Sequence, residues 1–118
     1  MKIIDLYYPK KRGGIISKYD GYVLIMYDIS TLTKKSKTIY RKFFKALEAK
    51  GYIMGLESFY YKYYDNLANY KYDINYFETI LDDDTNVIAI KLTSKEFDNL
   101  IYLSGNKLPK LDDKVVIY

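Results

Sequence analysis

The sequence contains no cysteine and no histidine among its 118 residues. The lack of cysteine excludes a disulfide-stapled fold, a thiolate metal site and a cysteine nucleophile. The lack of histidine removes the usual general base, serine–histidine triads and nearly all zinc chemistry. Any chemistry must therefore use aspartate, glutamate, lysine, tyrosine, serine or threonine side chains.

Long apolar runs are also missing, and none approaches the roughly 20 residues that a membrane-spanning helix needs. Near the start, the basic cluster at residues 10–12 follows a short apolar stretch instead of preceding it, unlike a secretory signal peptide. We therefore expect a cytoplasmic protein with no membrane contact. The length predicts one domain, and a hydrophobic fraction of 49% suffices for a packed core.

The net charge of +4 is concentrated in one short segment. Residues 34–50 carry seven basic side chains and one acidic one, a net charge of +6, whereas residues 1–33 carry +2 and residues 51–118 carry −4. A basic segment in an otherwise acidic chain favours a localised contact with a polyanion.

The first half of the hydrophobic pattern predicts a strand followed by a helix. Residues 22–28 form a continuous apolar run, typical of a central strand buried on both faces. The helix should extend to about residue 50, capped by Ser30, Thr31 or Thr33. Its apolar positions form a single stripe. They are Ile39, Tyr40, Phe43, Phe44 and Leu47.

The second half predicts further alternation. Residues 52–64 are expected to be extended, as one bent strand or a tight hairpin with a bulge at Gly55. A second helix, capped by Asp65 or Asn66, should reach Leu81. A buried strand at 86–92 should follow. The remaining expected elements are a short helix that begins with a Thr93–Glu96 capping box and ends at Leu103, and a last strand at 114–118.

This order predicts an α+β, ferredoxin-like βαββαβ fold with an extra C-terminal strand, over residues 22–118. Residues 1–21 are expected to form a basic N-terminal leader. In such a fold both helices cover one face of an antiparallel sheet. The other face needs a cover, and a second copy of the chain is the simplest one, so we expect a homodimer.

Four segments in this order resemble the CRISPR-associated "Cas two" family, in the style of members that accompany single-effector type II systems. They are YVLIMYDIS at 22–30, YRKFFKALEAKGYIM at 40–54, SFYYK at 58–62 and KLTSKEFDNLIYLSG at 91–105. The resemblance implies a ferredoxin-like homodimer that assembles with the large CRISPR integrase subunit. There it would hold double-stranded prespacer DNA as a non-catalytic scaffold for spacer acquisition.

Asp28, at the end of the first strand, is the candidate catalytic and metal-binding residue. The resemblance implies that some family members use this aspartate as metal-dependent nucleases. Two copies of Asp28 near a two-fold axis would be able to share one hydrated Mg²⁺. The alternative reading is an Asx-turn or a cap for the following helix. A stand-alone Mg²⁺-dependent endonuclease, on RNA or DNA, is thus the main functional alternative.

Basic side chains supply the candidate nucleic-acid-binding residues. Lys34, Lys37, Arg41 and Lys45 are spaced by three or four residues and so line one side of the predicted helix, and Lys35 and Lys42 widen the stripe. Such a stripe fits sequence-independent contacts to phosphates, or else an ordinary solvated face. Lys10, Lys11 and Arg12 would form a flexible phosphate-binding arm or a solubilising tail.

Two further clusters have alternative readings. A tyrosine cluster would stack bases in an RNA-binding module, or pack in the core and at an interface. Its members are Tyr60, Tyr61, Tyr63 and Tyr64. The acidic run at residues 82–84 is expected to be an exposed loop, with a metal site or a docking point for a basic partner as alternatives.

Overall fold

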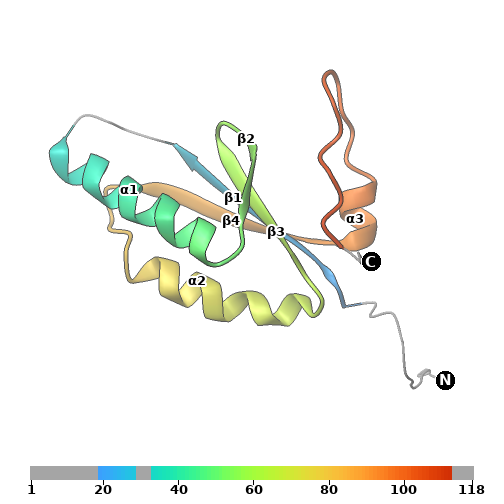
Figure 1. Cartoon of the computed structure of the whole chain (residues 1–118), viewed down its shortest axis with the longest axis horizontal. Helices are drawn as coiled ribbons and strands as arrows, with labels where there is room; N and C mark the ends of the chain where they lie inside the picture. The colour runs from blue at the N-terminus through green and yellow to red at the C-terminus, as the bar shows by residue number, and fades with distance from the viewer. Residues whose placement is uncertain (1–18, 29–32, 113–118) are drawn as a thin grey trace.

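A computed structural model describes residues 19–28 and 33–112 of the chain. Four strands form one antiparallel sheet in the order β2-β3-β1-β4, with α1 and α2 on one face (Figure 1). The strands are β1 (Gly21–Asp28), β2 (Ile53–Leu56), β3 (Phe59–Tyr64) and β4 (Asn86–Thr93). The helices are α1 (Lys34–Ala49), α2 (Tyr70–Glu78) and α3 (Ser94–Asp98). The predicted ferredoxin-like βαββαβ order is confirmed.

Strand β1 lies between β3 and β4 and is buried on both faces, as its continuous apolar run predicts. Val23 and Ile25 point toward the helices and are 0% and 1% exposed. Tyr22 and Leu24 point to the opposite face and are 2% and 8% exposed. Because neighbours on both sides satisfy the backbone of β1, it forms a rigid centre that fixes the position of its last residue, Asp28.

Helix α1 begins at Lys34 because Thr33 caps it. The Thr33 hydroxyl accepts a hydrogen bond from the Ser36 amide at 3.0 Å. The other two predicted caps lie outside the described residues. The predicted apolar stripe packs on the sheet, with Tyr40, Phe43 and Leu47 buried. The helix ends as predicted, because Gly51 adopts a φ of +89°, which a glycine tolerates best.

Residues 52–64 form a tight hairpin, which settles one of the two predicted alternatives. Strands β2 and β3 pair with a register shift between Met54 and Leu56, so the predicted bulge lies at Gly55. A Cβ atom at Gly55 would lie 2.3 Å from the ring of Phe59, which explains why a glycine occupies this position.

Two predicted helices are longer than the observed ones. The second begins with a short 3-10 turn at Leu67–Asn69, capped by Asn66, and α2 ends at Glu78 instead of Leu81. The Thr79 and Ile80 amides bond to carbonyls only three residues back, so the helix tightens and closes there. Leu81 nevertheless packs on the core, which is why its spacing suggested a longer helix.

The third helix shows the Thr93–Glu96 capping box that the sequence predicts, but α3 ends at Asp98 instead of Leu103. The apolar side chains beyond it do not complete a buried stripe: Ile101 is 86% exposed and Leu103 95% exposed. Without that stripe, the chain leaves the helix and turns back across the sheet.

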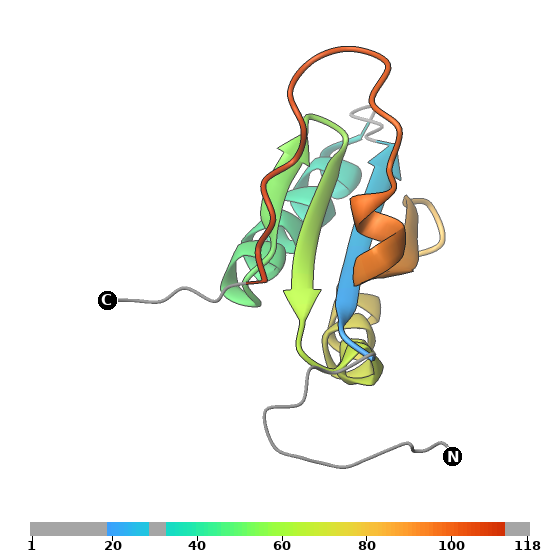
Figure 2. The ribbon, with the colours of Figure 1, turned by 90° about the vertical axis from the view of Figure 1, so that its right-hand side faces the viewer.

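Residues 99–112 run along the face of the sheet opposite α1 and α2 (Figure 2). Two tyrosine hydroxyls of the sheet hold them. The Tyr61 hydroxyl donates to the Pro109 carbonyl at 2.9 Å, and the Leu111 amide donates to the Tyr22 hydroxyl at 2.9 Å. This segment, with α3, covers only part of that face.

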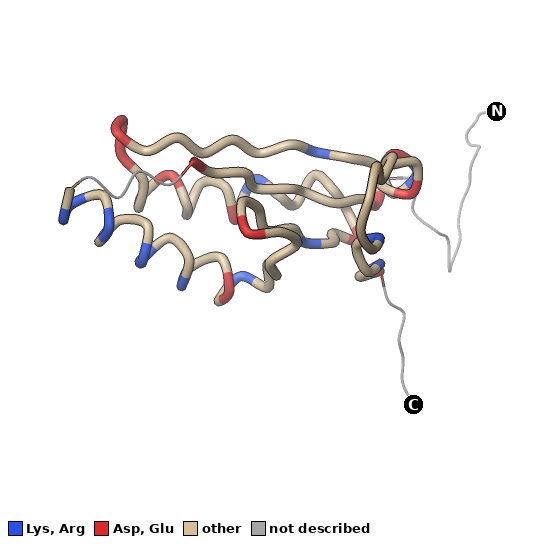
Figure 3. The backbone as a smooth tube through the Cα atoms, turned by 90° about the horizontal axis from the view of Figure 1, so that it is seen from above, with Lys and Arg blue, Asp and Glu red and all other residues tan. Residues whose placement is uncertain are grey.

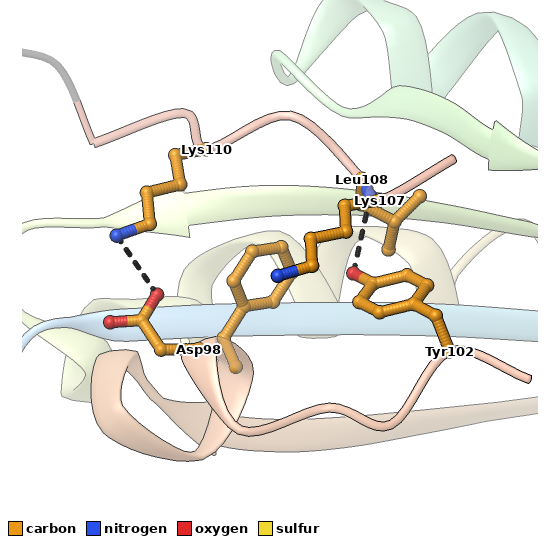
Figure 4. A pocket seen from close by; sticks show the side chains of 6 residues that line it. Asp98, Tyr102, Lys107, Leu108 and Lys110 are labelled. Carbon is orange, nitrogen blue, oxygen red and sulfur yellow. Dashed lines mark hydrogen bonds and ion pairs between the residues drawn. The ribbon is translucent and has the colours of Figure 1, made fainter. Parts of the chain in front are cut away.

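Within the same segment, a hollow of about 260 Å³ lies between α3 and the returning chain (Figure 4). The Leu108 amide donates to the Tyr102 hydroxyl at 3.1 Å, and Lys110 forms an ion pair with Asp98 at 3.2 Å. The first contact closes the segment on itself, and the second ties the segment to α3.

The predicted strand at 114–118 and residues 1–18 of the predicted leader lie outside the described residues. Among the helices that the structure describes, none is long and apolar enough to cross a membrane.

Candidate functional site

The outward side of α1 carries a row of cations along its whole length, as Figure 3 shows. All six predicted cations on α1 are exposed, while Ser36, Tyr40 and Phe43 on the opposite side are buried. The six cations, here named the α1 basic face, are Lys34, Lys35, Lys37, Arg41, Lys42 and Lys45. The helical spacing therefore brings together the residues that the sequence assigned to nucleic acid.

Among the described residues, most of the α1 basic face has no anionic partner. Lys35 forms an ion pair with Asp82 of the α2–β4 loop, at 3.6 Å between Nζ and Oδ2. In the described ranges the other five cations form no ion pair. Five like charges on one helix side repel one another, so the surface gains stability when a polyanion neutralises them. The acidic loop at residues 82–84 shields only the N-terminal end of the helix.

Asp28 lies at the exposed end of β1, on the face of the sheet opposite α1 and α2. It pairs across the strands with Asn86 of β4, and the two residues line a hollow of about 270 Å³ with Met26, Ser58 and Ile88. The N-cap of α1 is Thr33, so the alternative in which Asp28 caps this helix is wrong.

Tyr40 of α1 holds the ends of the two strands together beneath Asp28. Its hydroxyl donates to the Asp28 carbonyl at 2.5 Å and accepts from the Asn86 amide at 3.3 Å. The backbone at Asp28 is thereby fixed, while the carboxylate remains exposed.

A single chain supplies one carboxylate at this position. Over the residues that the structure describes, no three acidic side chains come close enough to hold a metal ion, and this includes the run at 82–84. Mg²⁺ usually keeps several waters and takes one or two carboxylates. Asp28 would supply one such carboxylate to a hydrated Mg²⁺.

The tyrosine cluster on β3 packs inside the protein, which is one of its two predicted readings. Tyr60, Tyr61 and Tyr64 are 5%, 0% and 6% exposed, so their ring faces are not available to bases. Burial raises the pKa of all three phenols. Tyr63 is half-buried and donates to Asp20 at 2.7 Å, and burial together with this bond raises its pKa as well.

The sequence did not reveal an ion pair that joins β3 to α2. Lys62 of β3 and Asp73 of α2 approach to 2.9 Å, and the Tyr64 hydroxyl donates to the same Asp73 oxygen at 2.6 Å. Tyr52 bonds to Tyr64 at 2.8 Å. Only the fold brings these residues together, because they belong to β3, to α2 and to the connection between α1 and β2.

Comparisons with known proteins indicate one family. A family model for CRISPR associated protein Cas2 matches residues 21–100. A curated relative from Campylobacter jejuni, named CRISPR-associated endoribonuclease Cas2, is 35% identical over 83 residues, 70% of this chain. That alignment spans 58% of the relative's own length.

A solved structure described as "Crystal structure of cas2" superposes with a TM-score of 0.54 at 17% identity. The match covers 83% of this chain and 99% of the other, and at this identity it supports the fold alone. Because the family model covers more than half of the sequence, and the fold agrees with it, the chain belongs to the CRISPR associated protein Cas2 family.

Proposed function

We propose that this chain is the DNA-binding scaffold subunit of a CRISPR adaptation complex. In this function a homodimer holds double-stranded prespacer DNA through backbone phosphates and presents it to the large integrase subunit. The observation that carries the proposal is the α1 basic face, with five exposed cations that have no ion-pair partner in the described ranges.

The arrangement of these cations favours a duplex backbone over a small anion. From Lys34 to Lys45 the row extends about 16 Å along a straight helix, which matches several successive phosphates. The side chains are exposed, so they present a surface to a partner instead of enclosing a ligand. Phosphate contacts of this kind position DNA without reading its sequence. Lys10, Lys11 and Arg12, which remain a prediction, would extend the same contact.

The test is the affinity of the full chain for a labelled blunt DNA duplex, measured by fluorescence anisotropy. Reversal of three cations, Lys37→Glu, Arg41→Glu and Lys42→Glu, should abolish binding because it puts three anions against the phosphates. The matched control reverses Lys71, Lys95 and Lys107, which are exposed and lie off α1. It changes the net charge equally and should retain most of the affinity. Equal losses in both variants would contradict the proposal.

The homodimer in this proposal is supported by the uncovered part of the sheet. Ile88 and Ile90 of β4 lie across from Met26 and Leu24, on the face opposite α1 and α2, and are 61% and 36% exposed. β4 is an edge strand that pairs with the central strand β1. An exposed apolar patch there would be buried if the same face of a second chain packed against it.

Sedimentation velocity tests this interface. Ile88→Glu should convert the dimer to monomer, because it places a charge in an apolar contact. Ile101→Glu, at a residue 86% exposed beyond α3, is the matched control and should leave the dimer intact. A dimer that survives Ile88→Glu would refute this interface.

The integrase subunit would dock on the acidic loop at residues 82–84 and on the strand that the sequence predicts at 114–118. In the α2–β4 loop, Asp83 and Asp84 are exposed and face no cation in the described ranges. A basic surface on the partner would complement them. Asp83→Lys with Asp84→Lys should weaken co-purification with the integrase subunit and leave duplex affinity at least as high as before.

A second candidate function is a Mg²⁺-dependent endonuclease. It is favoured by the name of the Campylobacter relative and by the exposed carboxylate of Asp28 on a fixed backbone. In the proposed dimer, two Asp28 side chains would hold one hydrated Mg²⁺, which would activate a water for attack on a phosphodiester. Asp28 would hold the metal, and Asn86 and Ser58 would line the hollow beside it.

Isothermal titration with Mg²⁺ or Mn²⁺ and a cleavage assay on single-stranded RNA and on DNA test this second function. Asp28→Asn keeps the shape of the side chain and should remove both metal heat and cleavage. Asp83→Asn removes an exposed carboxylate elsewhere and should change neither. Metal binding or cleavage that persists in Asp28→Asn would exclude Asp28 as the metal ligand.

A further inference from the structure

A hollow of about 450 Å³ lies at the N-terminal end of α2, away from Asp28. Tyr72 forms one side of it, and its polar lining includes Lys62, Asp65, Asn69 and Asp73. We name it the α2 hollow. It combines one exposed aromatic ring with an ammonium group, an amide and two carboxylates.

The polar groups of the α2 hollow retain hydrogen-bonding capacity. Asp73 accepts from Lys62 and from Tyr64 through one oxygen, Oδ2, and among the described residues its Oδ1 accepts no bond. Lys62 has three N–H donors and uses one of them on Asp73. The side chain of Asn69 makes no capping bond at the start of α2. An acceptor and a donor therefore lie side by side near the Asn69 amide.

Tyr72, the aromatic side of the α2 hollow, is unusually exposed for a large side chain. Tyr72 is 77% exposed, whereas Tyr76, one turn later, does not line the α2 hollow and is 44% exposed. The ammonium of Lys50 lies 4.8 Å from the ring centre of Tyr76. Aromatic faces that alternate with cations are typical of surfaces that bind single-stranded nucleic acid, because every base has a face to stack.

The position of the α2 hollow relates it to the α1 basic face. Gly51 follows Lys50, the C-cap of α1, and a Cβ atom at Gly51 would lie 3.9 Å from the Lys62 ammonium. The row of cations on α1 thus leads toward Lys50 and then to the α2 hollow. Because Lys50 also lies against Tyr76, one turn from Tyr72, a strand that leaves a duplex at the C-terminal end of α1 would pass close to the α2 hollow.

The charge of the α2 hollow selects the part of a nucleotide that enters. Two carboxylates face one ammonium there, so a phosphate would be repelled. A base has no net charge, and its edge offers donors and acceptors. Guanine fits best, because a carboxylate accepts from its adjacent N–H groups while a lysine donates to its O6 or N7 acceptor.

We propose that the α2 hollow binds the first unpaired base beyond a DNA duplex held on α1, with guanine preferred. This inference rests on the proposed function, since it takes the duplex on α1 as given. Tyr72 would stack on the base, and Lys62, Asn69 and Asp73 would bond to its edge.

Anisotropy titrations of the full chain test this, with a blunt duplex and with the same duplex carrying one unpaired guanine. The overhang should raise affinity by about five- to a hundredfold, the range for one base stacked on an aromatic ring. Tyr72→Ala should remove this gain without changing blunt-duplex affinity, and Tyr72→Phe should keep it. Tyr76→Ala, an exposed tyrosine outside the α2 hollow, is the matched control and should keep it as well.

Replacement of the unpaired guanine by inosine, which lacks the exocyclic amine, should lower the gain if a carboxylate reads that edge. An overhang that adds nothing to the affinity of a duplex that binds would overturn this inference and leave the proposed function standing. A gain that survives Tyr72→Ala would also overturn it. Failure of both duplexes to bind would overturn the proposed function and, with it, this inference.

Discussion

The salt dependence of duplex binding should report how many cations of α1 contact phosphates. Five members of the α1 basic face have no ion pair in the described ranges, and each that neutralises a phosphate releases about 0.9 counterions. A plot of log affinity against log salt should then have a slope of about −4.5 for each chain that contacts the duplex. The variant Lys37→Ala, Arg41→Ala, Lys42→Ala should reduce this slope to about −1.8.

These slopes predict large differences in affinity over an ordinary salt range. Between roughly 50 and 200 mM salt, the affinity of the native chain should fall about 500-fold and that of the triple alanine variant only about 12-fold. Alanine is a good helix former, so the variant should keep α1 intact. Circular dichroism of the variant checks this.

The Lys35–Asp82 pair provides an internal control for the same titration. Asp82→Asn removes the partner of Lys35 and frees a sixth cation, so the slope should steepen by about 0.9. Fluorescence anisotropy at five or more salt concentrations would supply the slopes. A triple variant with the native slope, or a native slope near zero, would refute the reasoning that α1 contacts the DNA.

Three further predictions concern the fold. Asp73→Ala leaves the Lys62 ammonium without its partner, and since Lys62 is 26% exposed we expect a loss near the lower end for such pairs, about 3 kcal/mol in urea unfolding; a loss as small as that of Asp83→Ala would contradict it. Gly21→Ala puts a Cβ atom 2.2 Å from the Leu92 carbonyl oxygen, so β1 and β4 must separate, which should lower stability by at least about 2 kcal/mol; native stability would exclude this contact. Burial raises the pKa of several phenols, so the folded state holds their protons more tightly than the unfolded state, and their contribution to stability should be constant below about pH 10 and be lost above it. These phenols are Tyr22, Tyr27, Tyr52, Tyr60, Tyr61, Tyr63 and Tyr64. Their absorbance as tyrosinate should appear only with loss of circular dichroism, and early ionisation in the native state would refute their burial.

Local patterns predicted most of the elements. The apolar run of β1, the stripe and cap of α1, the bulge at Gly55 and the capping box of α3 all depend on neighbours within a few residues, so spacing reveals them. The ends of α2 and α3 were predicted too far along. Apolar side chains at Leu81 and Leu103 suggested helix, although one packs from a turn and the other is exposed.

The candidate site was predictable only in part. The α1 basic face follows from helical periodicity, because residues three or four apart share a side. Asp28 was identified by its place at the end of an apolar run and by family resemblance. Its neighbours, Asn86 and Ser58, were not, because strand pairing brings them together from distant parts of the chain.

The sequence by itself determined which local elements form and where the charge is concentrated, since both depend on short-range spacing and composition. Only the tertiary structure decided which tyrosines are exposed. Periodicity cannot distinguish Tyr61, which is buried by the returning segment, from Tyr72, which is 77% exposed. The tertiary structure also decided that Lys62 pairs with Asp73, because burial and ion pairing depend on which distant segments fold against each other.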